Sequence, residues 1–166
     1  VGAGRKAGFY NYITQFSDFE EVSEPKVNAS IKHPLIDTVQ KWSEDCHKGA
    51  HSVYKEDFSK LEIATASYLE NYHDEFSKEK DYANVRGEDN IFKYIPLHKI
   101  AIRITKDDSL FAVISRIIAA KVSKVSLHVS IDMPIENGVV SFIYENKELL
   151  FGAHDTIVRE NEQAFT

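Results

Sequence analysis

The chain has 166 residues, of which 43% are hydrophobic and 11% aromatic, and its formal net charge at pH 7 is −6. This length holds one ordinary domain, or one small domain with an appended helical segment, and the composition favours a packed core over wholesale disorder. Acidic side chains are in excess in residues 18–90, whereas residues 91–166 hold equal numbers of acidic and basic ones. Because an acidic surface repels phosphate groups, nucleic acids and anionic membranes are disfavoured as partners.

The cysteine count and the lengths of the apolar runs indicate the cellular compartment. A single cysteine, Cys46, rules out an internal disulfide framework and favours a reducing, cytoplasmic compartment. No apolar run approaches the ~20 residues that span a bilayer, and the first residues lack a signal-peptide pattern. The chain opens at Val1, and its only methionine is Met133. The sequence therefore predicts a cytoplasmic fragment of a longer protein, without membrane insertion.

A glycine-rich opening precedes an aromatic run. Gly2, Gly4 and Gly8 predict a loop, and residues 9–16 predict a short strand or an anchored extended segment. Residues 17–32 have the mixed polar pattern of a connector. Dinucleotide-binding glycine loops need a strand before them and a helix after them, and no strand precedes this loop, so we do not expect it to bind phosphate.

Two amphipathic helices are predicted next. Pro34 is a suitable first helical residue, and one apolar stripe runs from it to Gly49; its members are Leu35, Val39, Trp42 and Cys46. A longer helix follows, with an apolar face made by Tyr54, Phe58, Leu61, Thr65, Tyr68, Tyr72 and Phe76. The short link between the two predicts a helical hairpin in which this aromatic row is buried.

The second half has the pattern of an α/β fold. Residues 98–104 alternate like a strand, residues 109–122 have the apolar spacing of a helix, and residues 124–131 alternate again. This order predicts a parallel β-α-β unit. Residues 134–144 fit either a further helix or one arm of a hairpin that turns at Asn146.

Residues 156–159 predict a third strand. No helix is predicted after it, although the sheets of α/β proteins are normally covered by helices on both faces. We therefore expect a truncated α/β domain in residues 91–166.

No group of residues predicts an active site. Cys46, His47 and His51 have the residue types of a metal site, but Cys46 lies on the apolar stripe and Gly49 interrupts the helix. The turn at residues 105–109 contains two carboxylates and no glycine, which opposes a bound pyrophosphate. We therefore predict no catalytic, cofactor-binding or metal-binding residue in this chain.

Two segments resemble a particular family. Residues 1–12, with Lys6-Ala7-Gly8 at their centre, resemble the G-x-G-x-K-A-G-G-P-x-Y-L stretch that follows the substrate-anchoring loop of glutamate semialdehyde dehydrogenases. Phe9-Tyr10 replaces the usual Gly-Pro. Gly87-Glu88-Asp89-Asn90 with the following Pro96 resembles the G-E-x-N-x(5)-P segment that opens the C-terminal domain of longer proline utilisation A proteins.

The resemblance implies a piece from near the C-terminal end of a bifunctional proline-catabolising enzyme of the proline utilisation A family. Residues 1–16 would be the tail of its aldehyde dehydrogenase domain, residues 17–90 a helical connector, and residues 91–166 the first part of a non-catalytic, Rossmann-like domain of aldehyde dehydrogenase type. In this family the catalytic residues and the contacts to FAD and NAD lie upstream of Val1, so the fragment is expected to be inactive and to hold no cofactor.

The resemblance also implies the partners. They would be the upstream dehydrogenase domains of the same polypeptide, where this region would help to cover the tunnel through which the intermediate passes, and any homo-oligomer would form through the parent enzyme. Two other functions stay open: a free-standing Rossmann-like module that senses a nucleotide through residues 98–131, and a helical adaptor that exposes the aromatic row to a foreign partner.

Overall fold

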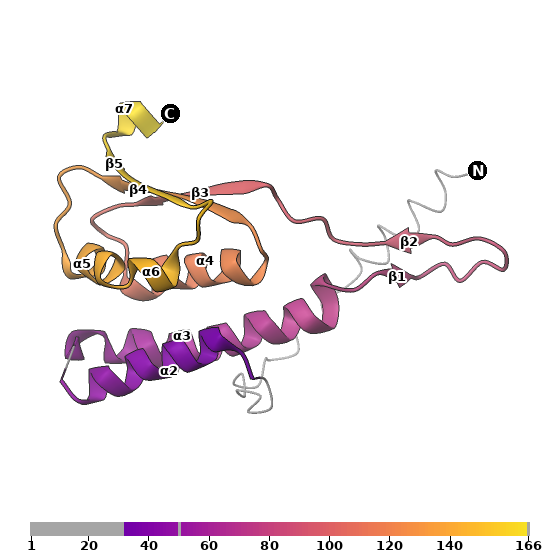
Figure 1. Ribbon diagram of the computed structural model, residues 1–166, viewed down its shortest axis with the longest axis horizontal. Coiled ribbons are helices and arrows are strands. Elements are labelled where there is room, and N and C mark those ends of the chain that lie inside the picture. The colour runs from indigo at the N-terminus through magenta and orange to yellow at the C-terminus, as the bar shows by residue number, and fades with distance from the viewer. Residues whose placement is uncertain (1–31, 50, 166) are drawn as a thin grey trace.

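The computed structural model describes residues 32–49 and 51–165, and it places a helical hairpin beneath a layered α/β unit (Figure 1). The features predicted for residues 1–31 lie outside the described residues, and so does the first of the two resembling segments. The structure is mixed α/β, with a parallel three-stranded sheet and a separate two-stranded pair.

The predicted helical hairpin is present. Helix α2 spans Pro34–His47, and the His33 ring accepts a hydrogen bond from the Leu35 N–H at its start. The chain turns through Gly49, whose φ of 111° lies in the left-handed region that glycine adopts readily. The 3-10 turn η1 (Ser52–Tyr54) then leads into α3 (Lys55–Asn71), which packs against α2.

The aromatic row is buried along α3 but not at its end. Phe58, Leu61 and Thr65 are buried, whereas Phe76 is 46% exposed, so the prediction for Phe76 was wrong. The helix continues as a π-helical turn, η2 (Tyr72–Phe76), in which the Ser77 N–H bonds to the Tyr72 carbonyl at 2.8 Å. A π-turn holds more residues than an α-turn, and it therefore rotates Phe76 away from the buried stripe.

A short antiparallel pair follows that the sequence analysis did not predict. Strands β1 (Lys80–Asp81) and β2 (Ile91–Phe92) form an arm that extends beyond the helices (Figure 1). The Asp81 carboxylate holds the loop between them by accepting the backbone N–H groups of Ala83, Asn84 and Asn90, and these bonds lower its pKa. Strands of two residues are too short to show a periodic pattern.

The parallel β-α-β unit is confirmed. Strands β3 (Lys99–Ile104), β4 (Ser126–Asp132) and β5 (Thr156–Glu160) lie in that order, and both pairs are parallel. Helix α4 (Leu110–Val122) connects the first two strands, and α5 (Gly138–Glu145) and α6 (Lys147–Leu150) connect the last two. These three helices cover one face of the sheet (Figure 1).

Two details of the C-terminal region decide questions that the sequence left open. Residues 138–145 form a helix rather than a hairpin, and it begins after Asn137, whose side chain accepts the Val140 N–H at 3.0 Å. Pro134 lies earlier, in a cis peptide bond with Met133. A short helix, α7 (Glu162–Phe165), follows β5 where no helix was predicted.

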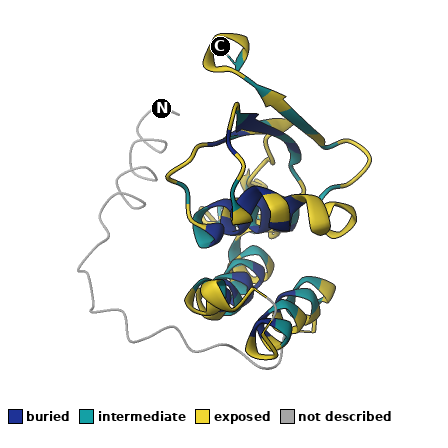
Figure 2. Cartoon of the chain, turned by 90° about the vertical axis from the view of Figure 1, so that its left-hand side faces the viewer, coloured by how far each residue is buried: buried dark blue, intermediate teal, exposed yellow. Residues whose placement is uncertain are grey.

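The hairpin and the α/β unit share one hydrophobic core. Helix α3 packs against α4, and the Phe142 ring of α5 lies 5.2 Å from the Trp42 ring and 5.5 Å from the Phe58 ring. The Trp42 indole N–H also donates to the Asn146 side chain at 2.9 Å. In Figure 2 the buried residues lie where these layers meet. Residues of the predicted connector therefore form part of the same core as the second half.

Candidate functional site at the carboxyl edge of the sheet

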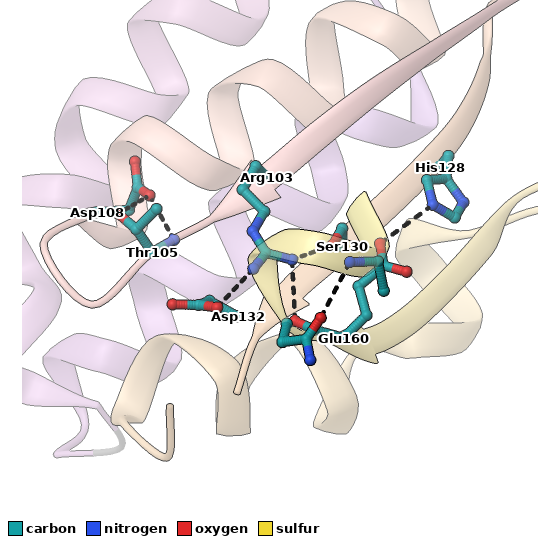
Figure 3. Close-up of polar contacts among 9 residues, drawn as sticks. Arg103, Thr105, Asp108, His128, Ser130, Asp132 and Glu160 are labelled. Carbon is teal, nitrogen blue, oxygen red and sulfur yellow. Dashed lines mark hydrogen bonds and ion pairs between the residues drawn. The ribbon is translucent and has the colours of Figure 1, made fainter. Parts of the chain in front are cut away.

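In open parallel α/β sheets, ligands bind outside the carboxyl ends of the strands. Here β3 ends at Ile104, β4 at Asp132 and β5 at Glu160, so these ends and the turns that follow them form the candidate site. Figure 3 shows the polar side chains that gather there. What this edge can bind depends on how many of their donors and acceptors remain free.

The turn after β3 is closed by a carboxylate. The backbone N–H and the hydroxyl of Thr105 both donate to Asp108 Oδ2 at 2.8 Å, and Arg116 donates to Asp108 Oδ1 at 3.3 Å (Figure 3). Partial burial acts to raise the pKa of Asp108, but the bonds from Thr105 and the charge of Arg116 outweigh it and lower that pKa. A negative charge therefore occupies the turn at the start of α4, and it would oppose a phosphate group there.

An arginine joins the three strands on the sheet face opposite helices α4 to α6. Arg103 of β3 donates to Ser130 Oγ at 2.5 Å, to the Glu160 carbonyl at 3.0 Å and to Asp132 Oδ1 at 2.5 Å (Figure 3). Its guanidinium carbon also lies 5.2 Å from the centre of the Phe165 ring of α7. Only 16% of the Arg103 side chain is exposed, and its donors are directed at acceptors within the protein.

A histidine and a glutamate lie beside this network on the same face. The His128 Nδ1 atom is 2.7 Å from the Thr156 hydroxyl, and its Nε2 atom is 3.7 Å from Glu160 Oε1. Glu160 Oε1 is buried and has no hydrogen-bond partner among the described residues. The His128–Glu160 contact is an ion pair only when the imidazole is protonated.

The residues considered for a metal site do not come together as one. Cys46 is buried and its thiol donates to the His51 carbonyl at 3.3 Å, while the His51 ring contacts Glu145 at 3.2 Å and the His47 ring contacts the Ser43 carbonyl. Residues 32–49 and 51–165 contain no group of three or more His, Cys, Asp or Glu side chains that could hold a metal ion.

Arg103 is the residue that the sequence analysis missed. It interrupts an alternating run between Ile102 and Ile104, and such alternation would have placed it on the polar side of a strand. Its partner Asp132 ends the next strand, but the sequence did not indicate that the two strands lie side by side with these residues in contact. No pattern in the sequence indicated a role for Glu160, at the end of the third strand.

Together these features define a class: a mixed α/β protein with a small parallel sheet, whose carboxyl edge is filled by its own side chains. Comparisons with protein-family models, with curated proteins and with solved structures found no match to this chain. Among the described helices, none combines the length and the apolar character needed to cross a membrane.

Proposed function

We propose that this chain is the non-catalytic C-terminal portion of a bifunctional proline-catabolising enzyme, in which it helps to cover the tunnel that carries the intermediate between active sites. The proposal begins from the two resembling segments, Lys6-Ala7-Gly8 and Gly87-Glu88-Asp89-Asn90. In this proposal the β-α-β unit is Rossmann-like and belongs to a domain of aldehyde dehydrogenase type, the cofactors FAD and NAD belong to the upstream domains, and the enzyme is cytoplasmic.

One observation carries the non-catalytic role: the edge at which an α/β sheet normally binds its ligand is occupied by internal contacts. Asp108 closes the first turn, and Arg103 is held by the ends of β4 and β5. A Rossmann-like unit that bound a nucleotide would need that first turn open and free of negative charge. The arrangement favours a scaffold over a nucleotide sensor.

The helical adaptor is supported less well. An adaptor of that kind needs an exposed aromatic face, yet Phe58 is buried in the core and the Trp42 indole is bonded to Asn146. Tyr54, Tyr68 and Tyr72 are packed in part against the same core. The aromatic row of α3 therefore serves mainly to join the hairpin to the α/β unit.

The decisive experiment deletes this region from the parent enzyme. The cut has to fall before α2, because α3 packs against α4 and a cut at residue 90 would divide the shared core. Without residues 33–166, both active sites should keep their chemistry, while the semialdehyde made from proline escapes to solvent. NADH formation from proline should then show a lag and become sensitive to trapping by o-aminobenzaldehyde.

The control is dehydrogenase activity on added semialdehyde, together with proline-dependent dye reduction, both measured on soluble protein. Each should change less than the coupled reaction, since a closed path keeps the intermediate at high effective concentration near the second site. An unchanged lag and unchanged trapping, with both activities retained, would exclude the covering role.

Calorimetry tests the competing nucleotide sensor. Titrating the chain with NAD or ATP should give no heat of binding, because the Asp108 carboxylate lies where a phosphate would bind. A saturable heat that grows in Asp108→Ala would favour a nucleotide site that this carboxylate restricts, and it would count against a purely structural role.

A further inference from the structure

A groove with a volume of about 690 Å³ lies between η2, residues 94–97 and the C-terminal half of α4. Its apolar lining includes Ile100, Ala119, Ala120 and Val125. A second hollow of about 710 Å³ adjoins it, and the two share Tyr72, Ser77 and Lys124 in their walls. We call these two adjoining hollows the α4 groove.

One wall of the α4 groove is a segment that belongs to no helix or strand. Residues 94–97 connect β2 to β3, and in the described part of the chain the backbone groups of Ile95 and Leu97 form no hydrogen bond. The side chains at these two positions are also accessible to solvent, since Ile95 is 80% and Leu97 67% exposed. Exposed backbone groups without partners can pair with the backbone of an extended peptide.

The charge of the α4 groove selects the kind of peptide. No acidic side chain lines the 690 Å³ hollow, whereas Arg116 and Lys124 do. The 710 Å³ hollow adds the basic Lys32 and Lys121 and the acidic Glu70 and Asp74, of which Asp74 is paired with Lys78, so basic side chains outnumber acidic ones in the α4 groove. Arg116 is already paired with Asp108, but Lys124 is exposed and has no ion pair within residues 32–49 and 51–165; its ammonium lies 5.8 Å from the centre of the Tyr72 ring. An unpaired ammonium beside an apolar floor complements a carboxylate next to apolar side chains.

We propose that the α4 groove binds an extended acidic peptide segment of a partner protein. The backbone of the peptide pairs with Ile95 and Leu97, its alternate apolar side chains lie over Ala119 and Ala120, and one carboxylate contacts Lys124. This site shares only Arg116 with the network of Arg103 and Asp108, and the proposal does not depend on the proposed function.

The test measures fluorescence anisotropy of labelled peptides with the full chain. The probe is a peptide of about eight residues, the length of an ordinary strand, in which valine and glutamate alternate. Matched probes replace every glutamate by lysine, or methylate the backbone nitrogens on the edge that would pair with the groove. The glutamate peptide should bind saturably, the lysine peptide about tenfold more weakly or not at all, and methylation should abolish binding.

Two exposed positions supply variants that should fold normally. Lys124→Glu should weaken binding of the glutamate peptide about tenfold and strengthen binding of the lysine peptide, and Leu97→Glu should weaken the glutamate peptide alone. Lys106→Glu makes the same charge change on the exposed turn after β3, away from the groove, and should have little effect.

Three results would each overturn the proposal. They are the absence of saturable binding up to about 1 mM peptide, equal binding of the glutamate and lysine peptides, and full binding by Lys124→Glu. Analytical ultracentrifugation adds a fourth: self-association that is lost in Leu97→Glu would assign the groove to a second copy of this chain instead.

Discussion

At the scale of single residues, Asp108 and Arg103 determine the character of the carboxyl edge. Asp108 is held by Thr105 of its own turn and by Arg116 of α4, and Arg103 is held by Ser130, Asp132 and the Glu160 carbonyl of the neighbouring strands. Because these bonds are charge-assisted and partly shielded from water, they are stronger than exposed contacts between the same groups. A few side chains therefore keep the edge closed, and the effect of removing each one on the free energy of unfolding can be measured.

Asp108→Ala should lower the free energy of unfolding at pH 7 by about 1–3 kcal/mol, because two donors of Thr105 lose their acceptor. The neighbouring Asp107→Ala is the matched control; its side chain is exposed, and its removal should change stability by less than about 0.5 kcal/mol. Urea denaturation followed by circular dichroism measures both. Equal effects of the two substitutions would contradict the role assigned to Asp108.

The contribution of Asp108 should also depend on pH. Its pKa is lower in the folded state than the usual value of about 3.9, so the ionised carboxylate stabilises the fold above that value. The contribution is lost as pH falls through the lower, folded-state pKa. The stability difference between the wild-type chain and Asp108→Ala should therefore be constant near neutrality and shrink below about pH 4. A stability difference that grows on acidification would contradict the lowered pKa of Asp108.

Arg103→Ala should destabilise the protein by about 2–4 kcal/mol, because Asp132 and the Glu160 carbonyl lose a shielded donor. Arg159 provides the comparison: it also forms an ion pair and a ring contact, with Glu136 and Tyr144, but its side chain is 34% exposed and that of Glu136 is 84% exposed. Arg159→Ala should cost less than about 1 kcal/mol. Thermal unfolding of the two variants measures both losses. A larger loss of stability in Arg159→Ala than in Arg103→Ala would contradict the role assigned to Arg103.

At the scale of elements, α3 is the segment that joins the two parts of the molecule. One side of it packs against α2 and another against α4, and it ends in the π-turn that exposes Phe76. That turn also forms one wall of the α4 groove, through Tyr72, Phe76 and Ser77. The same local change in helical geometry therefore ends the buried stripe and shapes the proposed peptide site.

Leu61→Ala should cost about 2–5 kcal/mol of unfolding free energy, because Leu61 is fully buried on α3 and its truncation leaves a cavity. Trp42→Ala should fall toward the lower part of that range, since Trp42 is half-buried and loses its bond to Asn146. Lys60→Ala on the exposed side of α3 is the control and should change little. A cost below about 1 kcal/mol for Leu61→Ala in chemical denaturation would mean that this face of α3 is not packed.

At the scale of the whole molecule, the shared core predicts one unfolding transition. Trp42 is the only tryptophan in the chain, and it lies at the contact between α2 and α5, so its fluorescence reports on the junction of the hairpin and the α/β unit. Far-ultraviolet circular dichroism reports on all the helices. The two signals should change at the same urea concentration, as two-state unfolding requires.

Two transitions at different urea concentrations would contradict the shared core. A fluorescence transition at lower urea than the dichroism transition would mean that the hairpin separates from the α/β unit before the rest unfolds. In that case residues 32–90 would be a connector with its own stability, and Leu61→Ala should shift the fluorescence transition alone. In the single-core case it should shift both by the same amount.

Most of the regular elements could be predicted from the sequence, because their apolar periodicity is local. The stripe from Val39 to Cys46 predicted α2, the spacing from Leu110 to Val122 predicted α4, and the alternation around Ile102 predicted β3. Where two local signals competed, the prediction stayed open: residues 134–144 fitted either a helix or one arm of a hairpin that turns at Asn146, and the structure forms a helix that begins after the Asn137 cap. The negative charge of the turn at residues 105–109 was expected as well, because its two carboxylates are neighbours in the chain, whereas the hydrogen bonds by which Asp108 closes the turn were not predicted.

The sequence by itself determined the class of the fold and the composition of that first turn. Only the tertiary structure decided that Arg103 meets Asp132 and the Glu160 carbonyl, that Trp42 bonds to Asn146, and that residues 94–97 form one wall of a groove with α4. The physical reason is that periodicity records which face of an element is apolar, whereas contacts between elements depend on strand order, register and packing, to which distant parts of the chain contribute together.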